Sequence, residues 1–123
     1  MIGCDCAVCH SSDPRDKRLR SSVYIETPET AFIVDTGADF RTQVLRENIR
    51  RVDAVVFTHS HTDHIMGFDD LRRFSWQRGS MPVYASAKSG RALPPHHFWT
   101  DSVCPIPSMI AHAPMTTATI SVV

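Results

Sequence analysis

Net charge is the first property that this 123-residue sequence lacks, because 13 lysines and arginines balance 13 aspartates and glutamates. A balanced chain has no general electrostatic attraction to nucleic acid or to an anionic membrane surface. No apolar run approaches the ~20 residues of a membrane-spanning helix. The first ten residues also lack the basic start and the apolar core of a secretory signal peptide. We therefore expect a cytoplasmic protein with no membrane partner.

The last quarter of the sequence is short of charge and of regular periodicity. Between residues 93 and 123 the only charged residue is Asp101, and five prolines interrupt the segment. We predict that residues 1–92 carry the folded domain and that residues 93–123 form an atypical, proline-rich tail that is foreign to the fold. We assign no ligand role to the histidines and the cysteine of this tail: His96, His97, Cys104 and His112.

Apolar patterning before residue 93 predicts an α/β fold with a mixed sheet. Strands are expected over residues 21–27, 30–37, 52–60 and 81–86. The first two should form a hairpin, because the break between them is short. Asp39 is placed to cap a helix after the second strand. The apolar face of that helix should be Val44, Leu45 and Ile49. A second helix should carry Ile65 and Phe74 on one face and end at Gly79.

The stretch VVFTHSHTDHIMG, residues 55–67, holds three histidines and one aspartate within six positions. Residues two apart in an extended segment face the same side, so His59 and His61 can present their imidazoles together. Asp63 and His64 follow just beyond a buried strand, where open α/β sheets place their sites. These side chains suit zinc, and a metal pair lowers the pKa of a shared water and clamps an anionic oxygen. The alternative, a solvated histidine-rich turn, does not account for the spacing.

Three cysteines stand within the first ten residues: Cys4, Cys6 and Cys9. In a reducing compartment, clustered thiols are more often metal ligands than disulfides, and three thiolates with a fourth ligand suit a structural zinc. The fourth ligand is open, because His10 adjoins Cys9 and has little room to share the ion. The run CAVCH also fits the attachment pattern of haem c, which requires export. No export signal is visible, so zinc is the favoured interpretation.

The segment THSHTDHIMG resembles the T-H-x-H-x-D-H-x-x-G signature of the metallo-β-lactamase fold superfamily. VDTGADFRTQ resembles that family's strand and D-x-G turn, and GCDCAVC resembles an element of its phosphoribosyl cyclic phosphate phosphodiesterase branch. The resemblance implies an αββα sandwich in which His59 and His61 bind one metal and Asp63 and His64 a second. It places Asp35 beside the site as an orienting residue. An equally open alternative is a turn aspartate that bonds to its own backbone.

The resemblance further implies a metal-dependent hydrolase that attacks a small phosphodiester with a metal-bound hydroxide, which Asp63 helps to orient. The metal would be zinc or manganese, with a structural zinc on the three cysteines. Alternatives are a thioesterase-like or lactonase-like hydrolase, a tRNA-processing nuclease, and a non-catalytic zinc-binding protein. The neutral charge argues against a nucleic-acid substrate.

Members of this branch are about twice as long and supply further metal ligands downstream. We therefore expect this chain to be only the N-terminal half of the sandwich, shortened at both ends. Each metal would keep two protein ligands, so the activity should be weak at best. Apolar sheet surface would stay uncovered, which favours aggregation or an oligomer.

Overall fold

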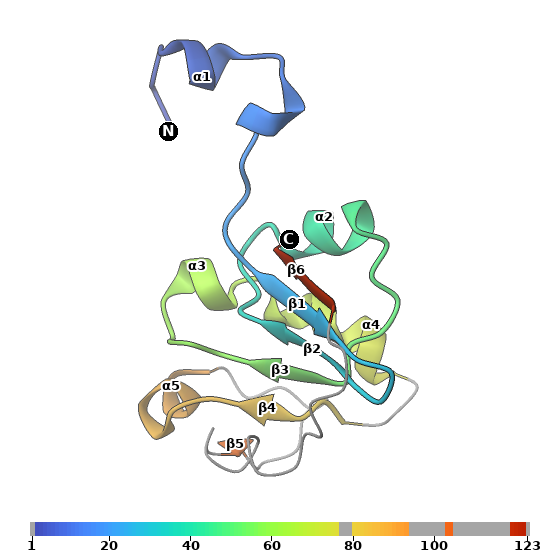
Figure 1. Cartoon of the computed structure of the whole chain (residues 1–123). Coiled ribbons are helices and arrows are strands. Elements are labelled where there is room, and N and C mark those ends of the chain that lie inside the picture. The colour runs from blue at the N-terminus through green and yellow to red at the C-terminus, as the bar shows by residue number, and fades with distance from the viewer. Residues whose placement is uncertain (1, 77–79, 94–102, 105–118, 123) are drawn as a thin grey trace.

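A computed structural model describes residues 2–76, 80–93, 103–104 and 119–122 (Figure 1). The strands are β1 (Val23–Glu26), β2 (Ala31–Val34), β3 (Ala54–Val56), β4 (Val83–Tyr84), β5 (Val103–Cys104) and β6 (Thr119–Val122). They form one sheet in the order β5-β4-β3-β2-β1-β6. β1 pairs antiparallel with β2 and β6, whereas the strands from β2 to β5 are parallel. The predicted hairpin and mixed sheet are confirmed.

Short helical segments connect the strands. They are α1 (Ala7–His10), the 3-10 turn η1 (Pro14–Asp16), α2 (Phe40–Arg46), α3 (Thr62–Ile65), the 3-10 turn η2 (Phe68–Leu71), α4 (Arg72–Ser75) and α5 (Ala87–Ala92). In Figure 1, α1 and η1 stand apart from the sheet on an N-terminal arm, and neither contains a buried residue. None of the helices in the described residues is long and apolar enough to cross a membrane.

The hydrophobic core lies between one face of the sheet and the segments α2, η2 and α4. Alternate residues of the strands point into it, as strand geometry requires, and the helical segments contribute large side chains from the other side. The rings of Phe57 and Phe68 meet edge to face, with centroids 5.2 Å apart. Each fully buried side chain of this size stabilises the fold by about 1.5–3 kcal/mol. The largest apolar members of the core are Ile33, Phe40, Val55, Phe57, Phe68, Leu71 and Met81.

The opposite face of the sheet is apolar and only partly buried. The register places Ile25 opposite both Phe32 and Ile120, so these three side chains lie on one face. Ile120 is 66% exposed and Val122 is 75% exposed. Half-buried members of the same face are Val23, Ile25, Phe32, Val34, Val56 and Tyr84. We call these eight residues the open sheet face.

The single helix expected from Ile65 to Phe74 is wrong, because the structure has three short segments there. The break falls at Gly67, whose backbone N–H bonds to the carbonyl of Thr36 at 2.9 Å and so leaves the helical ladder. This contact between distant segments ends the helix, although the apolar residues continue at helical spacing. The expected end at Gly79 lies outside the described residues.

The first helix also differs from the prediction. Leu45 is 69% exposed, and the buried residues of α2 are Phe40 and Gln43. Asp39 sits at the N-cap position but forms no capping hydrogen bond. Its carboxylate accepts from the backbone N–H of Arg20 at 3.0 Å and from the Arg20 guanidinium at 3.2 Å instead. The cap residue therefore fastens the chain that leads into β1.

Candidate metal centre

Two loops meet at one end of the sheet to form the candidate site. β2 and β3 are parallel, so the D-T-G turn after β2 and the histidine loop after β3 begin at the same end of the sheet, where the carboxyl ends of the strands lie. The backbone joins them: Asp35 N–H donates to the carbonyl of Val56 at 2.9 Å, and Thr36 N–H donates to the carbonyl of His64 at 2.7 Å. These bonds fix the histidine loop against the sheet.

Gly37 and Gly67 let the two loops approach this closely. A Cβ atom on Gly37 would lie 2.5 Å from the carbonyl oxygen of Asp63. A Cβ atom on Gly67 would overlap the carbonyl of Gly37 and lie 2.6 Å from Cβ of Phe40. Both distances are shorter than van der Waals contact, so any side chain at either glycine would push the loops apart.

The four predicted ligands of the histidine loop lie at this end of the sheet. The ring centroids of His59 and His64 are 3.9 Å apart, and those of His59 and His61 are 4.6 Å apart. An Asp63 carboxylate oxygen lies 3.6 Å from Nε2 of His64. The three imidazole rings and the carboxylate thus lie near one another at this end of the sheet, but no three of their ligand atoms come within 4.8 Å of one another.

Asp35 organises two of these imidazoles. One carboxylate oxygen accepts from Thr58 N–H at 2.9 Å, and the other lies 2.6 Å from Oγ1 of Thr58 and 2.8 Å from Nδ1 of His64. A carboxylate only accepts, so the Thr58 hydroxyl spends its single hydrogen on Asp35. That hydroxyl must then accept from Nδ1 of His59, which lies 2.9 Å away.

This network determines the tautomers of both rings. In the neutral form of each ring, His59 and His64 carry the hydrogen on Nδ1, and the lone pair on Nε2 is then available to a metal ion. The D-x-G turn predicts Asp35 near the site, whereas no such prediction is made for Thr58, although this threonine opens the T-H-x-H signature. The hydroxyl links Asp35 to a histidine that the carboxylate does not contact directly.

Asp35 has an unusual backbone for a residue in this role. It is 5% exposed and has φ of 60°, the left-handed region that aspartate and asparagine tolerate best among side-chain-bearing residues. The conformation turns the chain after β2 and directs the carboxylate toward the histidine loop. The structure thus favours an orienting aspartate over one that bonds only to its own turn.

The three cysteines form a second cluster on the N-terminal arm. The sulfur atoms of Cys4, Cys6 and Cys9 all lie within 4.8 Å of one another, and among the described residues this is the tightest group of potential ligands. Hydrogen bonds lower the pKa of Cys6 to about 7, first from the backbone N–H of Cys9 and then from the thiols of Cys4 and Cys9. His10, the neighbour of Cys9, contacts Asp5: its Nε2 lies 3.2 Å from a carboxylate oxygen of Asp5.

The family follows from a direct comparison. The family model described as a beta-lactamase superfamily domain matches residues 30–120. This chain belongs to the metallo-β-lactamase superfamily. The match includes both the D-T-G turn and the histidine loop, and it confirms the predicted fold class.

A solved structure has a similar fold. A crystal structure titled as a new diphosphatase from the PhnP family is 51% identical, with a TM-score of 0.69. The similarity covers 75% of this chain and 38% of that one. This relative lies in the branch that the cysteine element indicates.

Two curated relatives carry other names. An octanoyltransferase of Porphyromonas gingivalis is 46% identical over 85 residues, which are 68% of this chain and 17% of that protein. Exodeoxyribonuclease WalJ of Streptococcus pneumoniae is 35% identical over 78 residues, 59% of this chain and 28% of that protein. The chain thus spans less than two fifths of the length of each of these relatives.

The roles of the individual residues stay predictions, as does the division at residue 92. Two strands, β5 and β6, come from the segment after that residue and lie at the two edges of the sheet. His96, His97 and His112 lie outside the described residues. The described part of this superfamily member therefore contributes two candidate ligand pairs, namely His59 with His61 and Asp63 with His64.

Proposed function

We propose that this protein is a metal-dependent hydrolase that cleaves a small phosphodiester or diphosphate. The observation that carries the proposal is the hydrogen-bond network from Asp35 to His59 and His64, which makes Nε2 the metal-binding nitrogen of each neutral ring. A solvated turn has no need of a buried carboxylate that fixes two tautomers. Membership of the superfamily and the diphosphatase name of the solved relative support the same chemistry.

The donor set fits divalent metal ions such as zinc or manganese. Imidazole nitrogen and carboxylate oxygen are ligands that both ions accept, and the backing carboxylate of Asp35 is the usual partner of a metal-binding histidine. His59 and His61 would hold one ion, with Asp63 and His64 holding a second. When bound, such a pair supplies an activated water and neutralises charge on the phosphoryl oxygens.

The chain's own residues then have distinct tasks. Asp63, which has 57% of its side chain exposed, is placed to accept a hydrogen bond from the attacking water and to orient it. Asp35 and Thr58 keep the histidine rings in one orientation while charge builds up on the substrate. Catalytic zinc usually has three protein ligands, so two per ion should give weak binding and slow turnover.

The test combines metal analysis with an activity assay. Purified protein should bind zinc or manganese at the histidine site and hydrolyse bis-(nitrophenyl) phosphate slowly. Loss of a single ligand commonly weakens a metal site by well over tenfold, so His61→Ala should remove both binding and turnover. His10→Gln is the matched control, because His10 is exposed on the arm, away from the sheet (Figure 1).

A non-catalytic zinc-binding protein is the main alternative. If metal binds at the histidine site and turnover stays at the rate of the metal ion in buffer, hydrolysis is the wrong assignment. If His61→Ala changes neither metal content nor turnover, the site itself is wrongly placed. A soluble monomer with two tightly held metals and rapid turnover would instead show that residues such as His112 complete the ligand set.

Nucleic acid is a second candidate substrate, favoured by the exodeoxyribonuclease among the relatives. Its phosphodiester bond needs the same chemistry, so the site does not separate the two. The neutral chain lacks the excess of basic residues that usually binds a polyanion. Parallel assays on a single-stranded oligonucleotide and on bis-(nitrophenyl) phosphate would distinguish the classes.

The cysteine cluster is proposed to hold a structural zinc. Three sulfur atoms gather there, whereas a haem c thioether pair needs only two. A metal count that falls by one per chain in Cys4→Ser, with the histidine site unaffected, supports this assignment. Covalently bound haem in the purified protein would contradict it.

A further inference from the structure

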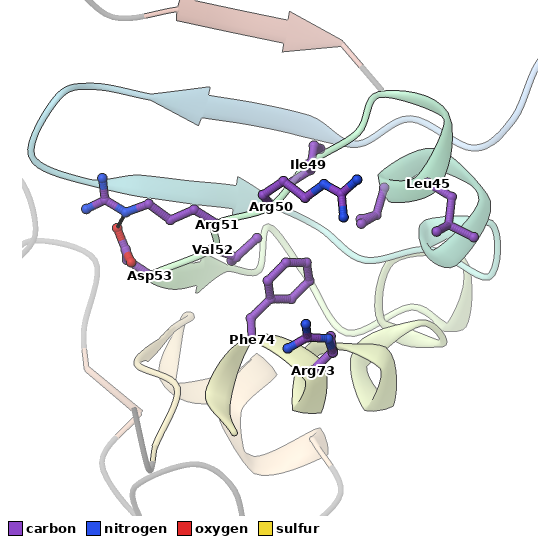
Figure 2. A pocket seen from close by; sticks show the side chains of 9 residues that line it. Leu45, Ile49, Arg50, Arg51, Val52, Asp53, Arg73 and Phe74 are labelled. Carbon is purple, nitrogen blue, oxygen red and sulfur yellow. Dashed lines mark ion pairs between the residues drawn. The ribbon is translucent and has the colours of Figure 1, made fainter. Parts of the chain in front are cut away.

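A cavity of about 390 Å³ lies at the other end of β3 from the candidate metal centre, and Figure 2 shows the residues that line it. It is formed by the end of α2, the segment before β3 and one residue pair of α4. The histidine loop leaves the carboxyl end of β3, whereas Arg50, Arg51 and Asp53 of this cavity precede its amino end. The two sites are therefore at opposite ends of the same strand. The cavity is lined by Val44, Leu45, Ile49, Arg50, Arg51, Val52, Asp53, Arg73 and Phe74.

The floor of the cavity is apolar and anchored in the core. Val52 is 2% exposed and Ile49 is 8% exposed, while Val44 and Phe74 pack against the core cluster from the surface side. Figure 2 shows the Phe74 ring in the middle of the cavity. A neighbouring hollow of about 300 Å³ shares Leu45 and Phe74, so the apolar surface continues toward α2.

The rim carries unbalanced positive charge. Arg51 is paired with Asp53, with Nε 2.6 Å from the carboxylate, so this pair is neutral. Arg50 bonds through Nε to the neutral side chain of Asn48 at 2.7 Å. Arg73 makes no hydrogen bond or ion pair within the part of the chain that the structure describes. Among the described residues, no carboxylate pairs with the guanidinium group of Arg50 or of Arg73.

Both arginines line the cavity together with Phe74. In Figure 2 the guanidinium groups of Arg50 and Arg73 lie on opposite sides of the Phe74 ring. Guanidinium groups recognise carboxylate and phosphate through paired, charge-assisted hydrogen bonds. A cavity of this size lies at the small end of the range that small-molecule sites occupy.

We propose that this cavity binds an amphipathic organic anion, whose apolar body rests on Phe74 and Val44 and whose anionic head lies between Arg50 and Arg73. The charge of the rim selects an anion, and the buried floor selects an apolar body. A carboxylate and a phosphate monoester share this chemistry. The site is separate from the proposed hydrolytic centre and needs no metal ion.

Calorimetric titration of the full chain, with a chelator present, tests the proposal. The probes are decanoate and decyl phosphate, with decanol as the uncharged match and inorganic phosphate as the match without an apolar body. Decanoate or decyl phosphate should bind about tenfold more tightly than either partial probe, since one charge-assisted contact is worth at least that factor. The stronger of the two identifies the head group.

Substitutions place the binding in this cavity. Arg73→Gln should weaken the better probe about tenfold. Arg72→Gln is the matched control: Arg72 adjoins it in α4, pairs with Asp69 at 2.7 Å and does not line the cavity. Equal losses in both variants would overturn the proposal, because they would show a general charge effect. Binding of decanol as tight as that of decanoate would also overturn it, since the open sheet face would explain such binding.

Discussion

At the level of single residues, Asp35 contacts His64 directly and His59 through Thr58, so we expect it to determine which nitrogen of each ring is available for a metal. Replacement by asparagine tests this role with little disturbance of the fold, because asparagine has the same shape and tolerates the left-handed backbone. An amide has only one acceptor oxygen, so it cannot accept from the Thr58 N–H on one side and from the Thr58 hydroxyl and His64 Nδ1–H on the other. With that oxygen held by the Thr58 N–H, His64 should lose its Nδ1–H tautomer. We expect zinc affinity at the histidine site to fall about 10- to 100-fold in Asp35→Asn.

Competition with a chromogenic chelator measures this change, and Asp69→Asn serves as the control because Asp69 is exposed and pairs with Arg72. Unchanged affinity in Asp35→Asn, with the fold intact by circular dichroism, would show that the carboxylate is only a turn residue. The sequence indicated the position of Asp35 through the D-x-G turn. It did not indicate the Thr58 relay, because a hydroxyl that both donates and accepts is recognised only from geometry.

At the level of elements, Gly67 joins the histidine loop to the D-T-G turn. Its φ of −86° is open to any residue, so the cost of a side chain there is steric. Gly67→Ala places a methyl group against the Gly37 carbonyl and Phe40, and overpacking of this kind costs about 1–3 kcal/mol. The thermal midpoint should fall accordingly and metal affinity should fall with it. Met66→Ala, at the exposed neighbouring position, should change both quantities little.

The contact between Asp39 and Arg20 fastens the N-terminal segment to α2, and it should depend on pH. The backbone N–H of Arg20, followed by its side chain, lowers the pKa of Asp39 below the usual range. The ionised carboxylate therefore stabilises the folded state above about pH 4, its ordinary pKa, and this stability is lost as the pH falls through the lowered pKa. Asp39→Asn should be less stable at pH 7 by about 1 kcal/mol or less.

Urea unfolding at several pH values checks this expectation. The difference in the free energy of unfolding between the wild-type protein and Asp39→Asn should shrink below pH 4. It should vanish once Asp39 is protonated in both the folded and the unfolded state. A difference that stays constant down to the lowest pH would mean that the charge of Asp39 contributes nothing. The sequence predicted this aspartate as a helix cap. Its side chain turns to Arg20 because that long-range partner offers both a backbone donor and a guanidinium.

At the scale of the whole molecule, the sequence predicted the sheet better than its helices. Strands such as β2 and β3 are short apolar runs bounded by turns, and their pairing follows from the hairpin and from parallel crossovers. The helical layer depends on contacts between segments distant in sequence, as at Gly67. Such contacts cannot be predicted from the spacing of apolar residues. The open sheet face was expected from the family resemblance, which places a second layer over that surface.

The two faces of the sheet should respond in opposite ways to the same charge. Ile33 is fully buried on the helix-covered face, so Ile33→Lys would bury an unpaired ammonium and should cost about 4 kcal/mol or more, enough to unfold a marginal domain. Ile120 is 66% exposed in the edge strand β6, and Ile120→Lys keeps its charge in water. This variant should stay folded and should self-associate less, because a charge on an exposed edge strand opposes pairing with a second copy of the chain.

Circular dichroism reports folding and light scattering reports association. Equal unfolding in the two variants would show that the face of Ile120 is closed in solution, and unchanged association in Ile120→Lys would show that the open sheet face is not a site of contact between copies.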